Sequence, residues 1–367
     1  MHLIYIVRYL SHISHVMNSS AFNKDLYLAI NQYFDGNGIS RFADGQMVAK
    51  LVIAGVWWAG SLALLLTISS SPTSFVLLYG FHLFSHLFIL LNIAHDANHS
   101  AIVKDGVLKN ALRYSFDLCG ISSYMWRLFH NHQHHNHMNV TGEDDGLVSH
   151  GLLRYTPHLK HRFFHRYQHK YLFLVYSFFS LDYIFVKDFE GFFFPFLNGL
   201  KEKKHPKIEY VKLFLLKLGY IGYVLVLPIY FLGFSASLVL LSFVVWQLLI
   251  GVIGATIIQV EHPLRLNEFP KSKSDYEHFI YHVFATTSDH SIDSFVANWF
   301  YGGLHLHVVH HLAPRVCHTH YRPLTRLVQE VAAKHGVYYK RNKTIFDAIR
   351  EHYMHLRNLS LSTTQPT

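Results

Sequence analysis

Four long apolar stretches constrain the fold of this 367-residue chain more than any other feature. They run over roughly 48–70, 75–94, 211–232 and 238–260. A helix needs about 20 consecutive apolar residues to cross the hydrocarbon core of a bilayer, and each stretch meets this length. We therefore predict an all-α membrane protein with four transmembrane helices.

The distribution of Lys and Arg predicts how these helices are oriented. The two short connections, Ser70 to Ser74 and Gly233 to Ser237, contain neither residue, whereas Lys104–Lys207 and Arg265–Arg357 contain many. Because cytoplasmic loops carry the excess of basic residues, both long segments and the N-terminus are expected in the cytoplasm. The four helices would then form two hairpins that enter the bilayer from one side, with the metal site on the cytosolic side.

Three regions follow from this topology. Residues 1–47 are expected to be an N-terminal cytosolic or interfacial segment without a cleavable signal, and 48–323 the membrane domain with a cytosolic helical cap. The aromatic stretch Tyr171–Phe196 is interrupted by charges and is predicted to be interfacial helix. Residues 324–367 are expected to be an amphipathic helix, Leu324 to about Leu356, followed by a polar tail.

Charge and cysteine content exclude other classes of protein. The net charge is +9, but the basic residues adjoin the apolar stretches instead of covering one soluble face, so we expect a lipid bilayer and no nucleic acid as partner. The only two cysteines, Cys119 and Cys317, are too few and too far apart for a disulfide framework or a thiolate metal site. The compartment is expected to be reducing.

Histidine is abundant, with 31 residues, and eight of them form three groups outside the apolar stretches. Within each group the spacing is i,i+3 or i,i+4, which places side chains on one helical face, or the residues are adjacent. The three groups are His95 and His99; His130, His134 and His135; and His307, His310 and His311. Eight imidazoles are twice what one tetrahedral ion needs, so we predict a two-metal centre bound by histidine alone.

Other histidines and other functions fit the sequence pattern less well. His82 and His86 are also four residues apart, but they are expected to face away from His95; His132 and His137 are expected to be surface residues. A histidine-rich metal transporter would place its ligands at mid-membrane, whereas these groups lie outside the apolar stretches. A membrane scaffold without catalytic activity is the remaining alternative.

The residues around the three groups resemble the histidine boxes of the membrane fatty acid desaturases, in particular the bacterial acyl-CoA or linoleoyl-CoA desaturase-like branch. The resemblance covers nearly the whole chain. The matching stretches are His95 to Ser100; Trp126-Arg127 with His130-Asn131, His134-His135, Asn139, Gly142 and Asp144; His165 to His169 with Tyr171; and Gly302 to His311 with Pro314-Arg315, His318 and His320-Tyr321.

This resemblance implies a di-iron enzyme that uses dioxygen and two external electrons to introduce a cis double bond into a long fatty acyl chain. It also implies a ninth metal ligand between the last span and the third group, which we assign to His282, with His278 and His262 as competing candidates. The acyl carrier, coenzyme A or a lipid, stays open. His307 stands where many relatives have Gln, and Ala313 where an aromatic residue is common, so the double-bond position also stays open.

The resemblance further implies a separate electron donor, because the sequence has no His-Pro-Gly-Gly haem motif of a fused cytochrome b5 domain. Ferredoxin, rubredoxin and cytochrome b5 are the candidate donors, and a bacterial inner membrane is expected before the endoplasmic reticulum. A lipid, alkane or carotenoid hydroxylase of the same metal class is the nearest alternative. Residues expected to orient the ligands are Asp96, Asn98, Asp144 and Asp289, and those expected to bind a phosphate are Arg113, Arg127 and Arg154.

Overall fold

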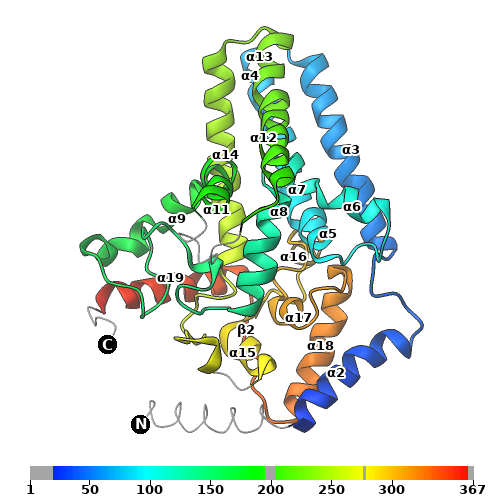
Figure 1. Ribbon diagram of the computed structural model, residues 1–367, viewed down its shortest axis with the longest axis vertical. Helices are drawn as coiled ribbons and strands as arrows, with labels where there is room; N and C mark the ends of the chain where they lie inside the picture. The colour runs from blue at the N-terminus through cyan, green and yellow to red at the C-terminus, as the bar shows by residue number, and fades with distance from the viewer. Residues whose placement is uncertain (1–19, 195–203, 276–277, 363–367) are drawn as a thin grey trace.

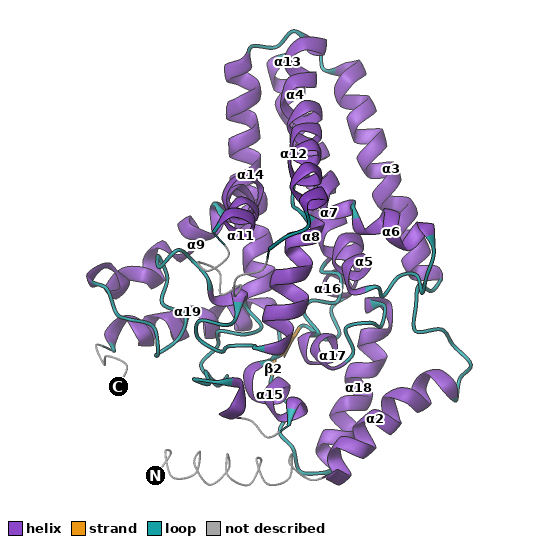
Figure 2. Cartoon of the chain, viewed as in Figure 1, coloured by secondary structure: helices purple, strands orange, loops and turns teal. Residues whose placement is uncertain are grey.

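The computed structural model describes residues 20–194, 204–275 and 278–362. The first nineteen residues, which are part of the predicted N-terminal segment 1–47, lie outside this range, as does the end of the polar tail. The described chain is almost entirely helical (Figure 2). Its strands there are two parallel two-residue segments, β1 (Asp289–His290) and β2 (Arg341–Asn342).

Four long apolar helical segments stand side by side in the upper half of the molecule (Figure 1). Each is long and apolar enough to cross a membrane, which confirms the prediction of four such helices. They comprise α3 (Gly45–Ile68); α4 (Pro72–Ile89) with the π-helical turn η1 (Leu90–Ala94) and α5 (His95–His99); α12 (Lys207–Ile221) with η8 (Gly222–Val226) and α13 (Leu227–Leu232); and α14 (Ala236–Gln259).

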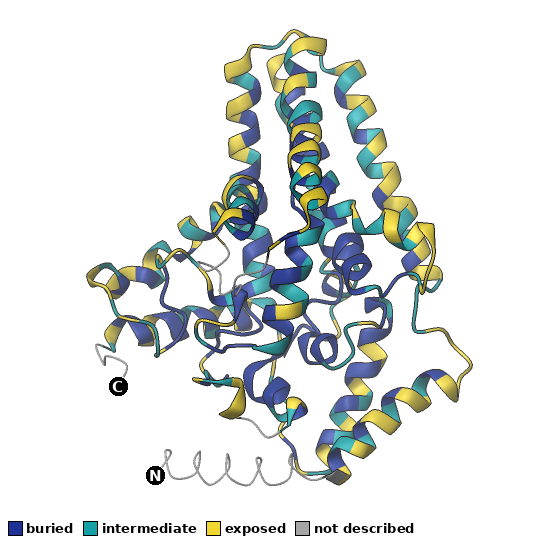
Figure 3. Ribbon diagram, viewed as in Figure 1, coloured by how far each residue is buried: buried dark blue, intermediate teal, exposed yellow. Residues whose placement is uncertain are grey.

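Local sequence signals set the ends of these helices. The Asp44 carboxylate accepts a hydrogen bond from the Met47 amide at 2.8 Å and caps α3. Ser71 and Ser74 form a reciprocal capping box at the start of α4. Gly233, at φ +68°, ends α13 in the left-handed conformation that a residue without Cβ adopts at no cost. The apolar outer faces of the long helices are extensively exposed, as expected of lipid-facing surfaces (Figure 3).

A second layer of helices lies at one end of the four long segments and has its own core. Helix α2 (Ser20–Asp35) packs against α18 (Tyr321–Lys334), and their apolar faces meet those of α15 (Phe279–Thr286) and α17 (His307–Leu312). Phe22, Leu26, Leu324 and Val328 are fully buried in this core. Because α17 carries His307, His310 and His311, this layer fixes these three residues relative to the membrane helices.

The remaining elements connect the two layers. Between α5 and α12 these are α6 (Val107–Arg113), α7 (Ser115–Leu118), α8 (Ser123–Trp126), η2 (Arg127–Gln133), η3 (His134–Asn136), η4 (Asp145–Leu147), η5 (Phe163–Tyr167), α9 (Gln168–Ser177), α10 (Phe179–Asp182), η6 (Tyr183–Lys187) and α11 (Asp188–Phe193). After α14 come η9 (Lys273–Asp275), α16 (Phe295–Phe300) and η10 (His318–His320). The stretch expected to be interfacial is thus a series of short helices, α9 to α11, of which α9 and α10 pack against α14.

The C-terminal region differs from the single amphipathic helix predicted between Leu324 and Leu356. The structure has two helices, α18 and α19 (Ile345–Leu361), separated by β2. Gly336 adopts φ +69° directly after α18 and stops it, because a left-handed residue cannot continue a right-handed helix. The second helix returns toward α9 and packs against it.

Candidate metal centre

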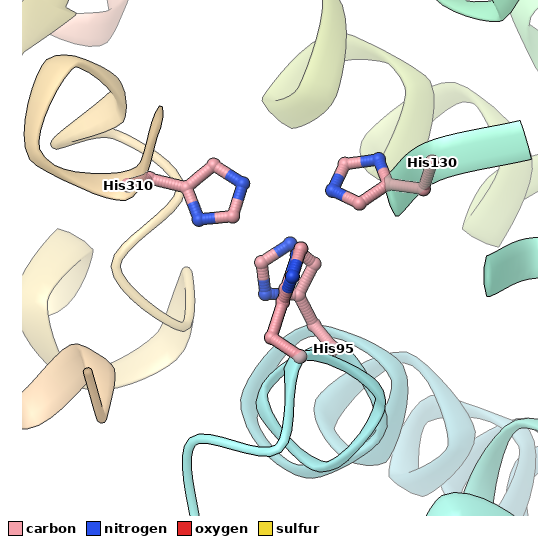
Figure 4. Close-up of side chains that lie close together, drawn as sticks. His95, His130 and His310 are labelled. Atoms are coloured by element: carbon pink, nitrogen blue, oxygen red, sulfur yellow. The ribbon is translucent and has the colours of Figure 1, made fainter. Parts of the chain in front are cut away.

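Four histidines from three distant parts of the chain converge on one point. Helix α5 supplies His95 and His99, the π-helical turn η2 supplies His130, and α17 supplies His310. One ring nitrogen of each lies within 4.8 Å of one ring nitrogen of the others. Figure 4 shows the rings of His95, His130 and His310 facing a common centre. We call these four residues the first histidine group.

A second set of four histidines lies next to the first and meets the same distance limit. It contains His134 from η3, His262 from the segment after α14, and His307 and His311 from α17. Their ring centroids are 4.7 to 6.3 Å apart. All four side chains are buried. We call these residues the second histidine group.

His135 lies between the two groups. Its Nε2 atom is 3.1 Å from Nε2 of His130 and 3.0 Å from Nε2 of His310. Its ring centroid is also 4.4 Å from that of His311 in the second group. The structure therefore brings all eight histidines of the three sequence groups together, with His262 as the ninth member.

The nitrogen positions fit two metal ions bound by imidazole. An imidazole nitrogen carries either one N–H or one lone pair, so two short contacts at Nε2 of His135 cannot both be well-aligned hydrogen bonds. Nitrogens bound at about 2.1 Å from one ion lie roughly 3.0 to 3.4 Å apart, which matches these contacts. Both ring nitrogens of His95 and Nε2 of His99 are buried without a hydrogen-bond partner among the described residues. A cation at the first group would satisfy one ring nitrogen of His95 and Nε2 of His99.

Hydrogen bonds on the opposite ring nitrogens orient the second group. The Nδ1–H of His134 donates to Asp144 at 2.8 Å, that of His262 donates to the Thr286 carbonyl at 3.1 Å, and that of His307 donates to the Leu304 carbonyl at 2.8 Å. A proton held on Nδ1 leaves the lone pair on Nε2 free for a metal. Asp144 therefore has the orienting position predicted for it.

Asp96 orients a different set of residues. Its Oδ2 atom accepts hydrogen bonds from the backbone N–H and from Nδ1–H of His318, at 2.9 and 2.8 Å, and its Oδ1 atom lies 3.6 Å from Nδ1 of His95. The ammonium group of Lys50 donates to Nε2 of His318 at 2.8 Å. Because both nitrogens of His318 are used, Asp96, Cys317 and His318 form a hydrogen-bond network and not a third metal site.

Burial favours the neutral form of six of these histidines, the form that a metal ligand needs. It lowers the pKa well below the ordinary value at five positions, which are His130, His135, His307, His310 and His311. Burial also lowers the pKa of His262, to about 3. A neutral imidazole offers a lone pair at neutral pH, whereas an imidazolium has none.

The structure does not bring His282 into either histidine group. Its Nε2–H donates to the Met138 carbonyl at 2.6 Å, and the ninth position is occupied by His262. His278 is likewise in neither group. The sequence signal for His262 was its place three residues beyond the end of α14, which returns it to the end of the membrane helices where His95 lies. His82 and His86 bond to Ser61 and Tyr223 within the membrane helices, away from both groups.

The other polar residues singled out in the sequence make structural contacts. The Asn98 side chain donates to backbone carbonyls and accepts from Arg127, and Asp289 accepts from the Val308 amide. Arg113 donates to Ser100. Arg154 is fully buried, and its guanidinium donates to four backbone carbonyls, which leaves it inaccessible to a phosphate.

A largely apolar cavity of about 280 Å³ borders both histidine groups. His95 and His130 of the first group and His134, His262 and His307 of the second line it. From there it continues between α4, α14 and the short helices α9 and α10. Its size and lining suit an extended hydrocarbon chain beside the two candidate metal positions.

These features define a class: a helical membrane protein with two adjacent all-histidine sites for metal ions at the wall of an apolar cavity. Comparison with known proteins agrees with this class. The model of the fatty acid desaturase family matches residues 70–343. The chain is 31% identical over 350 residues to the sn-1 linoleoyl-lipid 6-desaturase of Synechocystis sp., covering 90% of this chain and 93% of the relative.

Two further relatives support the assignment. The sn-1 linoleoyl-lipid 6-desaturase of Arthrospira platensis is 27% identical over 94% of both chains. The acyl-lipid (8-3)-desaturase of Physcomitrium patens is 31% identical over 94% of this chain and 73% of its own length. The chain belongs to the fatty acid desaturase family. It is an oxidoreductase that acts on fatty acyl chains.

Proposed function

We propose that this protein is a di-iron desaturase of membrane acyl lipids. The observation that carries the proposal is the wall shared by both histidine groups and the apolar cavity. The first group with His135 would hold one iron and the second group the other. When bound, the irons would use dioxygen, two external electrons and two protons to remove two hydrogens from neighbouring methylenes, leaving a cis double bond and two waters.

The protein's own part in this reaction is to position groups and to exclude water. Asp144 and the carbonyls of Thr286 and Leu304 hold three imidazoles with Nε2 facing the metal position. The Trp126 ring stacks on His130 at a centroid distance of 4.3 Å and also lines the cavity. Apolar side chains therefore cover the substrate side of the ligands, and a methylene can approach where bulk water cannot.

The substrate we propose is an acyl chain esterified to a glycerolipid, desaturated near its carboxyl end. This follows the names of the relatives, which are 6-desaturases of linoleoyl lipids and an acyl-lipid (8-3)-desaturase. The exposed apolar surface of the long helices supports a substrate that stays in the bilayer.

The topology and partners complete the proposal. Two hairpins entering the bilayer from one side would place α5, α17 and the histidine groups on the cytosolic face, where a separate ferredoxin, rubredoxin or cytochrome b5 could deliver electrons. The basic segments beside the helices support this orientation. A bacterial inner membrane is the proposed location, supported by the two cyanobacterial relatives.

Expression of the full chain in a host that lacks the product tests the proposal. We expect new fatty acids two mass units lighter than their precursors, and about two irons per purified chain. His134→Ala and His310→Ala should each abolish the new product and lower the iron content. An added oxygen in the product would instead identify a hydroxylase.

His137→Ala is the matched control for these two variants. His137 lies in the same loop but in neither group, and its Nε2 pairs with exposed Glu143 at 3.0 Å. Its replacement should leave both product and iron unchanged. New product that persists undiminished in both His134→Ala and His310→Ala would refute the assignment.

A further inference from the structure

Another cavity lies between the start of α12 and the short helices α6 to α8. It has a volume of about 260 Å³, and most of the side chains that line it are polar. No described residue lines both this cavity and the apolar cavity beside the histidine groups. Phe116 and Trp126 line the apolar cavity, whereas their neighbours Asp117 and Arg127 line the polar one. Helices α7 and α8 therefore separate the two cavities, and we call the second one the polar pocket.

The polar pocket lies where the membrane helices meet the second layer. Helices α7 and α8 lie at the lower end of α12 (Figure 1), and α7 packs against it. Lys212 and Leu213, in the first two turns of α12, line the pocket, while the next two residues, Phe214 and Leu215, are exposed and apolar. Lipid phosphates lie just outside the hydrocarbon core of a bilayer, so the pocket is at the depth of the lipid head groups.

The charges in the polar pocket are unequal. Three cations, Arg113, Arg127 and Lys212, and two carboxylic acids, Asp117 and Glu209, line it. Glu209 pairs with Lys212 at 2.8 Å. Burial raises the pKa of Asp117 to about 7, so this group carries less than a full negative charge at neutral pH. The pocket therefore has a positive net charge, which belongs to the two arginines.

The two arginines are close enough to repel each other. Arg127 is half-buried, and burial together with the charge of Arg113 lowers its pKa. The Nε atom of Arg113 is buried without a hydrogen-bond partner among the described residues. An anion between the two guanidinium groups would remove the repulsion and could accept from the unused N–H. Guanidinium groups bind phosphate oxygens in bidentate pairs, so the polar pocket suits a phosphate.

Both arginines also hold α5, the helix that carries two members of the first histidine group. Nη1 of Arg127 donates to Oδ1 of Asn98 at 2.8 Å, and Nη2 of Arg113 donates to the Ser100 hydroxyl at 2.8 Å. The Asn98 side chain in turn donates to the Arg113 carbonyl at 3.0 Å. A ligand that fixes the two guanidinium groups would therefore also restrict the movement of α5.

We propose that the polar pocket binds a phosphate group between Arg113 and Arg127, and that the bound phosphate holds α5 in place. A lipid head group and free inorganic phosphate offer the same chemistry, and the position of the pocket at the end of the membrane helices favours the head group. The ligand is separate from the acyl chain, because α7 and α8 divide the two cavities. The phosphate site depends on the pocket alone, whereas its effect on α5 rests on the proposed function.

Binding of small ligands to the purified full chain in neutral detergent tests the site. The probes are dihexanoylphosphatidylglycerol, inorganic phosphate, and dihexanoylglycerol, which has the same acyl groups but no phosphate. We expect dihexanoylphosphatidylglycerol to bind roughly tenfold or more tightly than dihexanoylglycerol. Weaker binding of inorganic phosphate would identify a lipid head group as the ligand, and equal or tighter binding would identify free phosphate. If neither phosphate probe bound better than dihexanoylglycerol, the proposal would be overturned.

Two variants locate the binding in the polar pocket. Arg127→Gln should weaken the binding of dihexanoylphosphatidylglycerol roughly 10- to 100-fold, as the loss of a charged donor allows. This variant also loses the bond to Asn98, so Asn110→Asp is the second variant. Asn110 lines the pocket and is exposed, and a carboxylate at this rim should weaken binding about fivefold without touching α5.

Lys109→Gln is the matched control for Asn110→Asp, because both variants change the net charge by the same amount at neighbouring positions. Lys109 does not line the polar pocket, and its ammonium group donates to the Lys104 carbonyl at 2.9 Å. Its replacement should leave the affinity unchanged. Equal weakening by Lys109→Gln and Asn110→Asp would overturn the assignment, because it would trace binding to the general charge of the surface.

Chelator titration of the iron-loaded protein tests the effect on α5. Saturating dihexanoylphosphatidylglycerol should raise the chelator concentration that removes half of the iron roughly fivefold or more in the unmodified protein, and not in Arg127→Gln. Binding without this change would overturn the effect on α5. If the purified protein contains no iron, the proposed function fails, and the binding measurements still decide whether the polar pocket is a phosphate site.

Discussion

Replacing Asp144 with Asn should weaken the second metal position without changing the size of the side chain. The Oδ1 atom of Asp144 accepts hydrogen bonds from Nδ1–H of His134 at 2.8 Å and from the Gly146 amide at 2.7 Å. Its Oδ2 atom accepts from the Asn139 amide at 2.7 Å. Burial raises the pKa of Asp144, but His134, His262 and the hydrogen bond from the Asn139 amide together more than offset this, so the net shift of the pKa is downward and the group is a carboxylate.

An asparagine has one acceptor oxygen where the carboxylate has two. If the amide oxygen faces His134, the NH₂ group meets the Asn139 N–H; if it is flipped, the NH₂ group meets the Gly146 N–H. Either way one buried backbone donor is unpaired, which costs about 1–3 kcal/mol. The flipped form also lets the His134 proton move to Nε2, which removes the lone pair that a metal needs. Loss of such a carboxylate partner typically weakens metal binding by about 10- to 100-fold.

Chelator titration of the iron-loaded protein measures this effect. Asp144→Asn should lose half of its iron at a chelator concentration roughly 10 to 100 times lower than the unmodified protein. Its unfolding transition should also move to lower temperature. Glu143→Gln is the matched control, since this neighbouring carboxylate is exposed and pairs with His137, which belongs to neither histidine group.

Unchanged resistance to chelator in Asp144→Asn would refute the reasoning. It would mean that the hydrogen bond from His134 to Asp144 does not set the orientation of that ligand. A loss of iron equal in Glu143→Gln and Asp144→Asn would contradict it too, because it would trace the effect to general charge and not to the bond.

Three further predictions follow from the packing of single residues. His262→Ala should lose most of the iron from both positions, because α17 supplies ligands to both groups, whereas His282→Ala should keep both irons. His282→Ala should instead lower the unfolding free energy by about 1–3 kcal/mol, because a buried carbonyl is left without its donor; elemental analysis and chemical denaturation distinguish the two. Gly302→Ala should prevent correct folding, since a Cβ there would lie 1.9 Å from a carbonyl oxygen of the η1 turn. Gly336→Ala has open space around the new Cβ and should lower the unfolding free energy by only about 1–2 kcal/mol, the cost of a left-handed alanine. The yield and the thermal unfolding temperature of the two variants test this difference. Burial lowers the pKa of His352 to about 3 in the folded protein, so the unfolded chain binds a proton at this residue first as the pH falls below 6.5. The unfolding free energy should therefore fall by up to about 1.4 kcal/mol per pH unit between pH 6.5 and 3. His352→Gln should flatten this dependence in denaturation measured across that pH range.

The membrane helices and the eight histidines with helical spacing could be predicted from sequence because both signals are local. An apolar run of membrane length stays visible whatever it packs against, and i,i+4 spacing defines a shared face without knowledge of the fold. The end of α18 also has a local sequence signal, because His335-Gly336 after a basic last turn is typical of a helix end. The regular spacing of apolar residues beyond it nevertheless favours a single continuous helix.

The assignment of ligands to the two groups could not be read from sequence, because it depends on how the elements pack. His134 and His135 are adjacent, yet the first joins the second group and the other lies between the groups. His282 and His262 both follow the last membrane helix, and only the packing of α15 turns His282 toward Met138. The pair of Asp145 and Lys187, 42 residues apart, left no local trace either.

Helix α17 supplies His310 to one group and His307 and His311 to the other. One turn of helix thus fixes the spacing between the two candidate metal positions, so a displacement of one position also displaces the other. Uptake of metal should consequently be cooperative: chains carrying a single ion should be scarce at every stage of loading, and empty and doubly filled chains should account for almost the whole population.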